Sequence, residues 1–227
     1  MSKHKTAATP INMRNSEDSG RSDERARLLR ARGLPQHIID FLVAPLRMIV
    51  LPDAWSRCLG LTSLEEERLR AVLPEIRGRL LDIGAGTNRL AQLYGDGIGV
   101  DVLDWGGGAL VVDDTRRLPF DDGSFDTASF VACLNHIPYR EEALLEAHRL
   151  LRTGGRVIVT MIGSIIGEVG HKLWWYSEDK HREVADGELM GMVRKHVEKC
   201  LRDAGFRDIV HRRFVYGLNH LFVAIKA

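Results

Sequence analysis

The stretch that most constrains the fold is Arg-Leu-Leu-Asp-Ile-Gly-Ala-Gly-Thr-Asn-Arg-Leu, at residues 79–90. Its apolar run ends in an acid and is bounded by glycine, which is typical of a strand buried on both faces. Gly84 and Gly86 leave room where the backbone must turn sharply or approach a ligand. Asn88 can cap the helix that the following residues predict. The stretch therefore predicts a strand, a loop and a helix N-terminus, the place where open α/β sheets bind nucleotide-like ligands.

The segment from Asp82 to Asn88 resembles the first motif of class I S-adenosylmethionine-dependent methyltransferases. In that family the loop lies against the methionine part of the cofactor, and the resemblance implies that Asp82 orients the cofactor's amino group, often through water. The loop also begins like the Gly-x-Gly-x-x-Gly fingerprint of dinucleotide-binding proteins, but Arg89 stands where that fingerprint has its third glycine. A general Rossmann-like nucleotide-binding domain thus remains open at this point.

A second predicted strand, Ile98 to Asp101, also ends in an acid. A carboxylate at this position accepts hydrogen bonds from both hydroxyl groups of a ribose. Asp101 is the candidate for this role, and Asp104 replaces it if the strand is longer. The feature fits methyltransferases and dinucleotide enzymes alike.

The connection after Asp101 departs from the usual methyltransferase pattern, in which a helix follows the acid. Three consecutive glycines, Gly106 to Gly108, oppose a helix here. We therefore expect a loop that leads directly into the next strand, Ala109 to Val112. Trp105 lies either near the adenine or in the space that the missing helix leaves.

The segment from Asp113 to Asp126 resembles a further signature of the same family, an acid followed after three residues by Leu-Pro-Phe and then by Asp-Gly-Ser-Phe-Asp. The resemblance implies that Asp114 accepts a hydrogen bond from the exocyclic amine of adenine and that the backbone of Thr115 faces the ring. This second match stands at the proper separation from the first, so it favours a methyltransferase over a general nucleotide-binding domain.

The fourth predicted strand, Thr127 to Leu134, ends where this family places the transferred methyl group. His136 follows that end, and an imidazole can take a proton near neutral pH, so His136 is the first candidate base. His171 is the second, provided that the aromatic segment around it folds over the site. Either histidine can equally have a structural role. The Asn/Asp-Pro-Pro-aromatic motif of nucleic-acid methyltransferases is missing. Their Pro-Cys motif is missing too, because Ala132 precedes Cys133.

Two strand-like runs near the C-terminus, Asp208 to Val215 and Leu221 to Lys226, flank a turn and predict a hairpin. Such an ending is typical of the methyltransferase fold and not of a dinucleotide dehydrogenase. We therefore expect an α/β fold of the class I methyltransferase type, with a Rossmann-like seven-stranded sheet, mostly parallel with an antiparallel C-terminal strand, and helices on both faces. The cofactor that the resemblance implies is S-adenosyl-L-methionine.

The sequence also predicts a domain organisation. Residues 1–33 are rich in Ser, Asp, Glu and Arg, and we expect a disordered tail. Residues 34–78 should form a helical cap, and residues 79–227 the cofactor-binding domain, with a lid-like insertion at about 162–192. The apolar part of the cap, residues 34–51, either covers the site or docks on a membrane surface.

The composition narrows the chemical class of the methyl acceptor. The chain has 32 basic and 31 acidic residues, which disfavours nucleic acid as a partner. Small-molecule, sugar or lipid-like acceptors lead, and a non-catalytic cofactor-binding module is the alternative class. No apolar run has the length of a membrane span, and no ligand spacing predicts a metal site. Three separated cysteines and an N-terminus without a secretory signal favour the cytoplasm.

Overall fold

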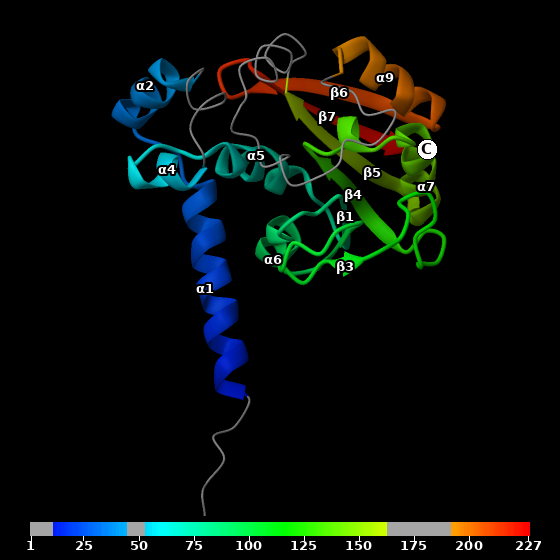
Figure 1. Cartoon of the computed structure of the whole chain (residues 1–227), viewed down its shortest axis with the longest axis horizontal. Helices are drawn as coiled ribbons and strands as arrows, with labels where there is room; N and C mark the ends of the chain where they lie inside the picture. Colours follow the sequence, from blue (N-terminus) through cyan, green and yellow to red (C-terminus); the bar gives the residue numbers. More distant parts are fainter. Residues whose placement is uncertain (1–10, 45–52, 163–191) are drawn as a thin grey trace, which may run out of the picture.

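The structure, a computed structural model, describes residues 11–44, 53–162 and 192–227. Its centre is a seven-stranded sheet in the order β3-β2-β1-β4-β5-β7-β6 (Figure 1). The strands are β1 (Leu80–Ile83), β2 (Gly97–Asp101), β3 (Leu110–Val111), β4 (Phe125–Val131), β5 (Leu151–Ile162), β6 (Phe206–Phe214) and β7 (Asn219–Lys226). The second candidate base, His171, and most of the expected insertion lie outside the described residues.

The strand directions follow the sequence prediction. Strands β1 to β5 pair in parallel, whereas β7 lies between β5 and β6 and runs antiparallel to both. Strands β6 and β7 form the expected terminal hairpin. The expected fold is therefore confirmed in its strand number, in its mostly parallel sheet and in its antiparallel C-terminal strand.

Helices lie on both faces of the sheet (Figure 1). They are α1 (Ile11–Leu29), α2 (Leu34–Leu42), α4 (Asp53–Cys58), α5 (Leu64–Val72), α6 (Arg89–Tyr94), α7 (Arg140–Leu150) and α9 (Arg194–Asp203), with short 3-10 turns η1 (Leu73–Glu75) and η2 (Leu134–His136). Ser63 caps α5, since its hydroxyl accepts the backbone N–H of Glu66 at 3.1 Å. None of the described helices combines the length and the apolar character needed to cross a bilayer.

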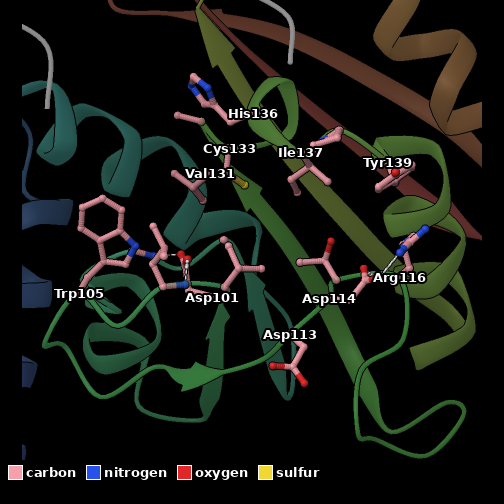
Figure 2. Close-up of a pocket in the computed structure, with 17 residues that line it drawn as sticks. Asp101, Trp105, Asp113, Asp114, Arg116, Val131, Cys133, His136, Ile137 and Tyr139 are labelled. Atoms are coloured by element: carbon pink, nitrogen blue, oxygen red, sulfur yellow. Dashed lines mark hydrogen bonds and ion pairs between the residues drawn. The ribbon is translucent and has the colours of Figure 1, made fainter. Parts of the chain in front are cut away.

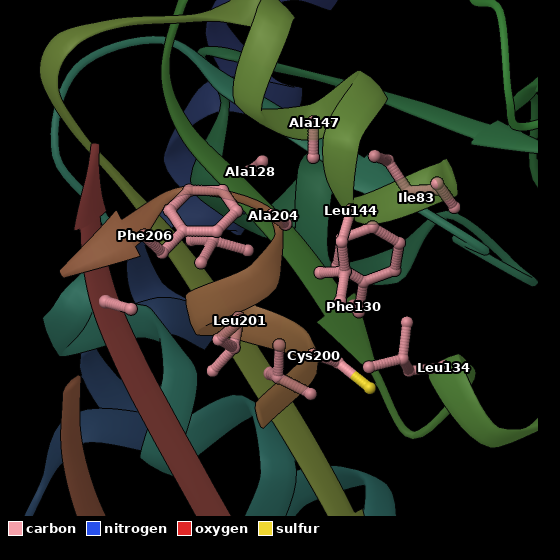
Figure 3. Packing of buried hydrophobic residues seen from close by; sticks show 14 of the residues in the cluster. Ile83, Ala128, Phe130, Leu134, Leu144, Ala147, Cys200, Leu201, Ala204 and Phe206 are labelled. Carbon is pink, nitrogen blue, oxygen red and sulfur yellow. The ribbon is translucent and has the colours of Figure 1, made fainter. Parts of the chain in front are cut away.

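Two apolar cores lie on opposite faces of the sheet, and β5 contributes to both. Val157 and Val159 join the core under α7 and α9, whereas Ile158 joins the core under α1, α5 and α6. Figure 3 shows the first of these cores, where Phe130 and Leu144 pack with Leu201 of α9. The alternation along one central strand explains why the sequence reads there as an unbroken apolar run.

The N-terminal segment differs from the expected disordered tail, because α1 occupies residues 11–29 and packs on the domain. Leu28 is buried in the core beside α5 and α6. Ion pairs join Glu24 to Arg89 of α6 at 2.5 Å and Arg27 to Glu66 of α5 at 3.0 Å. In the sequence, the alternating charges of this segment suggest a solvated surface. In the structure, two of these charges form ion pairs with the folded domain.

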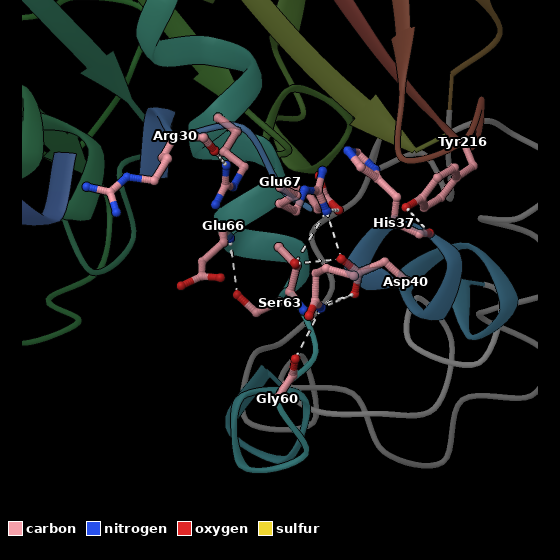
Figure 4. Close-up of polar contacts among 12 residues, drawn as sticks. Arg30, His37, Asp40, Gly60, Ser63, Glu66, Glu67 and Tyr216 are labelled. Atoms are coloured by element: carbon pink, nitrogen blue, oxygen red, sulfur yellow. Dashed lines mark hydrogen bonds and ion pairs between the residues drawn. The ribbon is translucent and has the colours of Figure 1, made fainter. Parts of the chain in front are cut away.

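A buried polar cluster attaches α2 to α5 (Figure 4). Asp40 of α2 is completely buried and accepts the backbone N–H and the hydroxyl of Thr62 at 3.1 and 2.7 Å. Arg32 donates to Asp40 at 2.9 Å and to both carboxylate oxygens of Glu67. Burial alone would raise the pKa of Asp40. Hydrogen bonds from Thr62, Gln36 and Arg32 instead hold that pKa below its ordinary value.

The opposite side of α2 is apolar and faces outward. Leu34 and Leu42 are 73% and 71% exposed, Phe41 is 58% exposed and also packs edge-on against the ring of Tyr216, and Trp55 of α4 is exposed too. Helix α2 thus buries its acid and exposes its apolar residues, the reverse of an ordinary surface helix. Residues 45–51, the rest of the expected docking segment, are outside the described part of the chain.

Candidate active site

A pocket of about 450 Å³ lies at the carboxyl ends of β1, β2 and β4 (Figure 2). Six of the site residues predicted from the sequence line it, namely Gly84, Gly86, Asp101, Asp114, Thr115 and His136. Two others, Asp82 and Asn88, are not among its lining residues. The position is the one at which parallel α/β sheets bind their ligands.

The glycine loop forms one wall of the pocket, and each glycine has its own reason to be there. A Cβ atom on Gly84 would lie 2.7 Å from the sulfur of Cys133, so a side chain does not fit against β4. Gly86 has a φ of +52°, and a Cβ there would meet nothing within 4 Å. The backbone of Gly86 therefore borders open space in the pocket, where a ligand can approach it closely.

Asp101 holds the glycine loop and the next connection together. Its Oδ2 accepts the backbone N–H of Gly86 at 2.8 Å, and its Oδ1 accepts that of Leu103 at 3.1 Å. Each carboxylate oxygen can accept a second hydrogen bond, so both remain available to a pair of ligand hydroxyls. The alternative acid, Asp104, is not among the lining residues and accepts the backbone N–H of Gly106 at 2.8 Å.

Asp82 lies behind the loop and not in the pocket wall. It is almost completely buried, and the hydroxyl of Ser129 donates to its Oδ1 at 2.6 Å. Burial raises the pKa of Asp82 to about 7, with a smaller upward contribution from the charge of Asp101, against the hydrogen bond from Ser129. The predicted role of Asp82 in orienting an amino group stays a prediction.

The side chain of Asn88 does not cap the following helix, so that expectation is wrong. Asn88 has a φ of +60° and makes no side-chain capping bond to α6. Its amide nitrogen instead lies 3.3 Å from the carbonyl oxygen of Gly107. A Cβ on Gly107 would lie 2.0 Å from the carbonyl oxygen of Thr87. The three-glycine connection therefore packs directly on the glycine loop, where the usual fold has a helix.

Asp114 is held by its own neighbour at the other end of the pocket. Its carboxylate accepts the backbone N–H of Arg116 at 2.8 Å and the Nε–H of the same residue at 2.6 Å. The hydrogen bonds from Arg116, opposed by weak burial, lower the pKa of Asp114. The guanidinium of Arg116 in turn lies 4.1 Å from the ring centre of Tyr139. The contacts of Arg116 with Asp114 and Tyr139 were not predicted from the sequence. Their only sequence signal is an arginine two residues after the acid.

The end of β4 forms the third wall. Ala132 has a φ of +57°, an uncommon conformation for a residue with a side chain, and its N–H donates to the carbonyl of Thr160 at 3.0 Å. His136 lines the pocket from η2, with its Nε2 3.1 Å from the amide nitrogen of Asn135. Burial, and then the charges of nearby acids, raise the pKa of Cys133 well above its ordinary value, so this thiol stays protonated.

Comparison with known proteins identifies the family of the chain. Residues 81–159 match the methyltransferase domain family. A solved Thermotoga maritima protein, described as an S-adenosylmethionine-dependent methyltransferase and possible histamine N-methyltransferase, is 25% identical with a TM-score of 0.55 over 71% of this chain and 88% of its own. The chain carries a class I S-adenosylmethionine-dependent methyltransferase domain.

Curated relatives of this methyltransferase include quinone-modifying enzymes. The 2-methoxy-6-polyprenyl-1,4-benzoquinol methylase of Pongo abelii is 34% identical over 71% of this chain and 52% of its own length. The demethylmenaquinone methyltransferase of Paenarthrobacter aurescens is 27% identical over 62% of this chain and 66% of its own length. The methyltransferase therefore spans about half the length of the first of these relatives.

The residues of the methyltransferase pocket fit S-adenosylmethionine. The open space beside Gly86 would let the cofactor's methionine part approach the backbone, and Asp101 would offer two acceptors to the ribose hydroxyls. Asp114 offers an acceptor at the opposite end, and Thr115 is buried beside it. Trp105 lies in the wall on the Asp101 side (Figure 2), so it belongs to the pocket and does not merely fill the space of the missing helix.

Proposed function

We propose that this methyltransferase acts on a small lipid-like acceptor, an aromatic quinol with an apolar tail. The observation that carries this proposal is the apolar wall near His136, where Val131, Ile137 and Pro138 line the pocket. The names of the curated relatives, which include a benzoquinol methylase and a demethylmenaquinone methyltransferase, support the same class. We also propose a cytoplasmic location, because a reducing compartment suits the three free thiols Cys58, Cys133 and Cys200.

The chain contributes mainly position and exclusion of water to the reaction. Bound S-adenosylmethionine supplies an electrophilic methyl group for in-line displacement. The glycine loop and Asp101 form one end of the pocket, Asp114 lies at the other, and the end of β4 forms a third wall, so these fixed walls would orient the cofactor toward the acceptor. The apolar wall keeps water from the cationic centre. In this proposal His136, which lines the pocket, takes the proton of an acceptor hydroxyl, and the expected second base, His171, lies outside the described residues.

Transfer of labelled methyl tests this function. The full chain is incubated with methyl-labelled cofactor and, separately, with a short-tailed naphthoquinol, with histamine, with a fatty acid and with glucose, and the products are identified by mass spectrometry. We expect label in the quinol, and we expect Asp101→Ala to abolish it. Label only in another acceptor would refute the quinol class. Cofactor binding without transfer to any acceptor, metabolite extracts included, would favour a non-catalytic module.

We infer as a second function that the methyltransferase docks on a lipid surface through α2. The reversed amphipathicity of this helix favours the inference, because Asp40 is buried while Leu34, Phe41 and Leu42 face outward. A bilayer interface is an environment in which such a face is stable, and it is also where a lipid-like acceptor is found.

Flotation with phosphatidylcholine–phosphatidylglycerol vesicles tests the docking. We expect the intact chain to float with the vesicles, and we expect Phe41→Ser combined with Leu42→Ser to stay in the dense fraction. Leu145→Ser is the matched control, because Leu145 is similarly exposed on α7. Equal flotation of all three proteins, or flotation of none, would contradict a docking role for α2.

A further inference from the structure

Outside the pocket, three side chains of metal-binding type converge between α7 and α9. His196 and Cys200 are four residues apart on α9, so they share one face of that helix. Glu141 lies in the first turn of α7. One ligand atom from each of the three residues lies within 4.8 Å of the other two. None of the three residues lines the cofactor pocket.

The spacing of these atoms is close to that of a tetrahedral site. Zinc bonds of about 2.0 to 2.3 Å to nitrogen, oxygen and sulfur place neighbouring ligand atoms about 3.5 Å apart. The sulfur of Cys200 already lies 3.7 Å from Oε1 of Glu141. Because all three ligand atoms lie within 4.8 Å of one another, they would need to approach by only about 1 Å to share one tetrahedral centre.

The burial of the three residues also suits a metal ion. Cys200 is buried in the core near Leu134 and Leu201 (Figure 3), whereas His196 is half-buried and Glu141 is exposed. The exposed carboxylate gives an entry path from solvent, and the buried thiol gives a ligand that water does not compete for. Sulfur, imidazole nitrogen and carboxylate oxygen together are a ligand set that zinc accepts.

We propose that Glu141, His196 and Cys200 bind a zinc ion, with water as the fourth ligand. Binding releases the thiol proton of Cys200 to solvent, and no oxidation is involved. The ion joins the first turn of α7 to one face of α9, outside the cofactor pocket. The proposal concerns a site that the sequence spacing did not predict, because Glu141 comes from a distant helix and joins only in three dimensions.

The test uses the metal itself and the full chain. After removal of metal with a chelator, we expect one equivalent of Zn²⁺ to rebind, and we expect Co²⁺ to give a thiolate-to-cobalt absorption band in the near ultraviolet. His196→Asn and Glu141→Gln should each weaken zinc affinity at least about 100-fold, since each removes a direct ligand. Cys200→Ser should abolish the thiolate band.

Two controls keep this test decisive. Cys58→Ser removes an exposed thiol on α4 and should leave zinc content and the cobalt band unchanged. Circular dichroism and S-adenosylmethionine binding show whether each variant is folded. If Cys200→Ser is not folded, His196→Asn and Glu141→Gln still test the site. A chain that retains no stoichiometric zinc, or zinc affinity unchanged in both His196→Asn and Glu141→Gln, would overturn the proposal.

Discussion

Asp82, a predicted cofactor contact, lies in an electrostatically unfavourable position. Its carboxyl group is buried behind the glycine loop, beside Ser129 and near the charge of Asp101. The folded-state pKa of about 7 lies above the ordinary value of 3.8. The folded state therefore prefers the protonated form, and the stability associated with Asp82 is complete below about pH 4 and is lost as the pH rises through 7.

We predict that Asp82→Asn stabilises the chain at high pH and not at low pH. An amide cannot ionise and still accepts the hydrogen bond from Ser129, so the free energy of unfolding should rise by about 4 kcal/mol at pH 8. Urea denaturation at pH 8 and pH 4 measures the effect, with exposed Asp121→Asn as the control. An equal change at both pH values would show that the charge of Asp82 is not responsible. If Asp82 orients the cofactor, the affinity for S-adenosylmethionine also falls in Asp82→Asn.

His136 carries the prediction about proton transfer. We expect His136→Ala to leave S-adenosylmethionine affinity nearly unchanged and to lower turnover of a hydroxyl acceptor by roughly 100-fold or more, because the base is lost while the cofactor pocket remains. Calorimetry measures the first quantity and labelled methyl transfer the second. Full turnover in His136→Ala, in His171→Ala and in the double variant would leave positioning alone as the mechanism.

At the scale of elements, the connection between β2 and β3 contains neither a helix nor a strand. Gly107 packs its backbone on that of Thr87, and its carbonyl oxygen also accepts from Gln92 at 2.7 Å. The pocket wall that contains Trp105 is therefore held by contacts to the glycine loop and to α6.

We predict that Gly107→Ala weakens cofactor binding. The added Cβ would lie 2.0 Å from a backbone oxygen, so the connection must move away from the glycine loop and carry Trp105 with it. Calorimetry should show a loss of S-adenosylmethionine affinity of about 10-fold or more, equivalent to at least about 1.4 kcal/mol. Gly20→Ala, where a Cβ meets nothing within 4 Å, should bind normally. Unchanged affinity in Gly107→Ala would mean that the two loops are not coupled.

The sequence predicts those parts of the fold and site that local patterns determine. The strand before Gly84, the acid Asp101 at the end of β2 and the terminal hairpin all follow from apolar runs and turn residues. The side-chain partner of Asn88 and the contact between Arg116 and Tyr139 do not, because each depends on residues that only folding brings near. The buried position of Asp82 has the same cause.

At the scale of the molecule, the N-terminal helices are attached to the domain by charge as well as by apolar contact. Arg32, Asp40 and Glu67 join segments that are distant in sequence, and Leu28 adds a buried apolar contact. The sequence missed this attachment because each partner alone has the composition of a solvated surface. The domain boundary near residue 34 consequently stays a prediction.

We predict that Asp40→Asn destabilises the whole chain. Arg32 keeps its pair with Glu67, but the amide loses the charge-assisted hydrogen bonds that the buried carboxylate accepts from Arg32 and Thr62, so the free energy of unfolding at pH 7 should fall by about 2 kcal/mol. Because the folded-state pKa of Asp40 is lowered, its contribution is present above about pH 4 and disappears as the pH falls through that lowered value. Urea denaturation should therefore show the difference shrinking in acid. Glu142→Gln, an exposed change on α7, should have little effect, and a difference independent of pH would contradict this account.

The position of β7 has a consequence for how the chain is made. Strand β5 ends at residue 162, but the strand that pairs with its second edge begins only at residue 219. A ribosome that adds roughly 5–20 residues per second leaves this edge open for several seconds. An unpaired edge containing Val157, Ile158 and Val159 readily pairs with another nascent chain. During synthesis, this protein must therefore rely on chaperones or on dilution until its hairpin arrives.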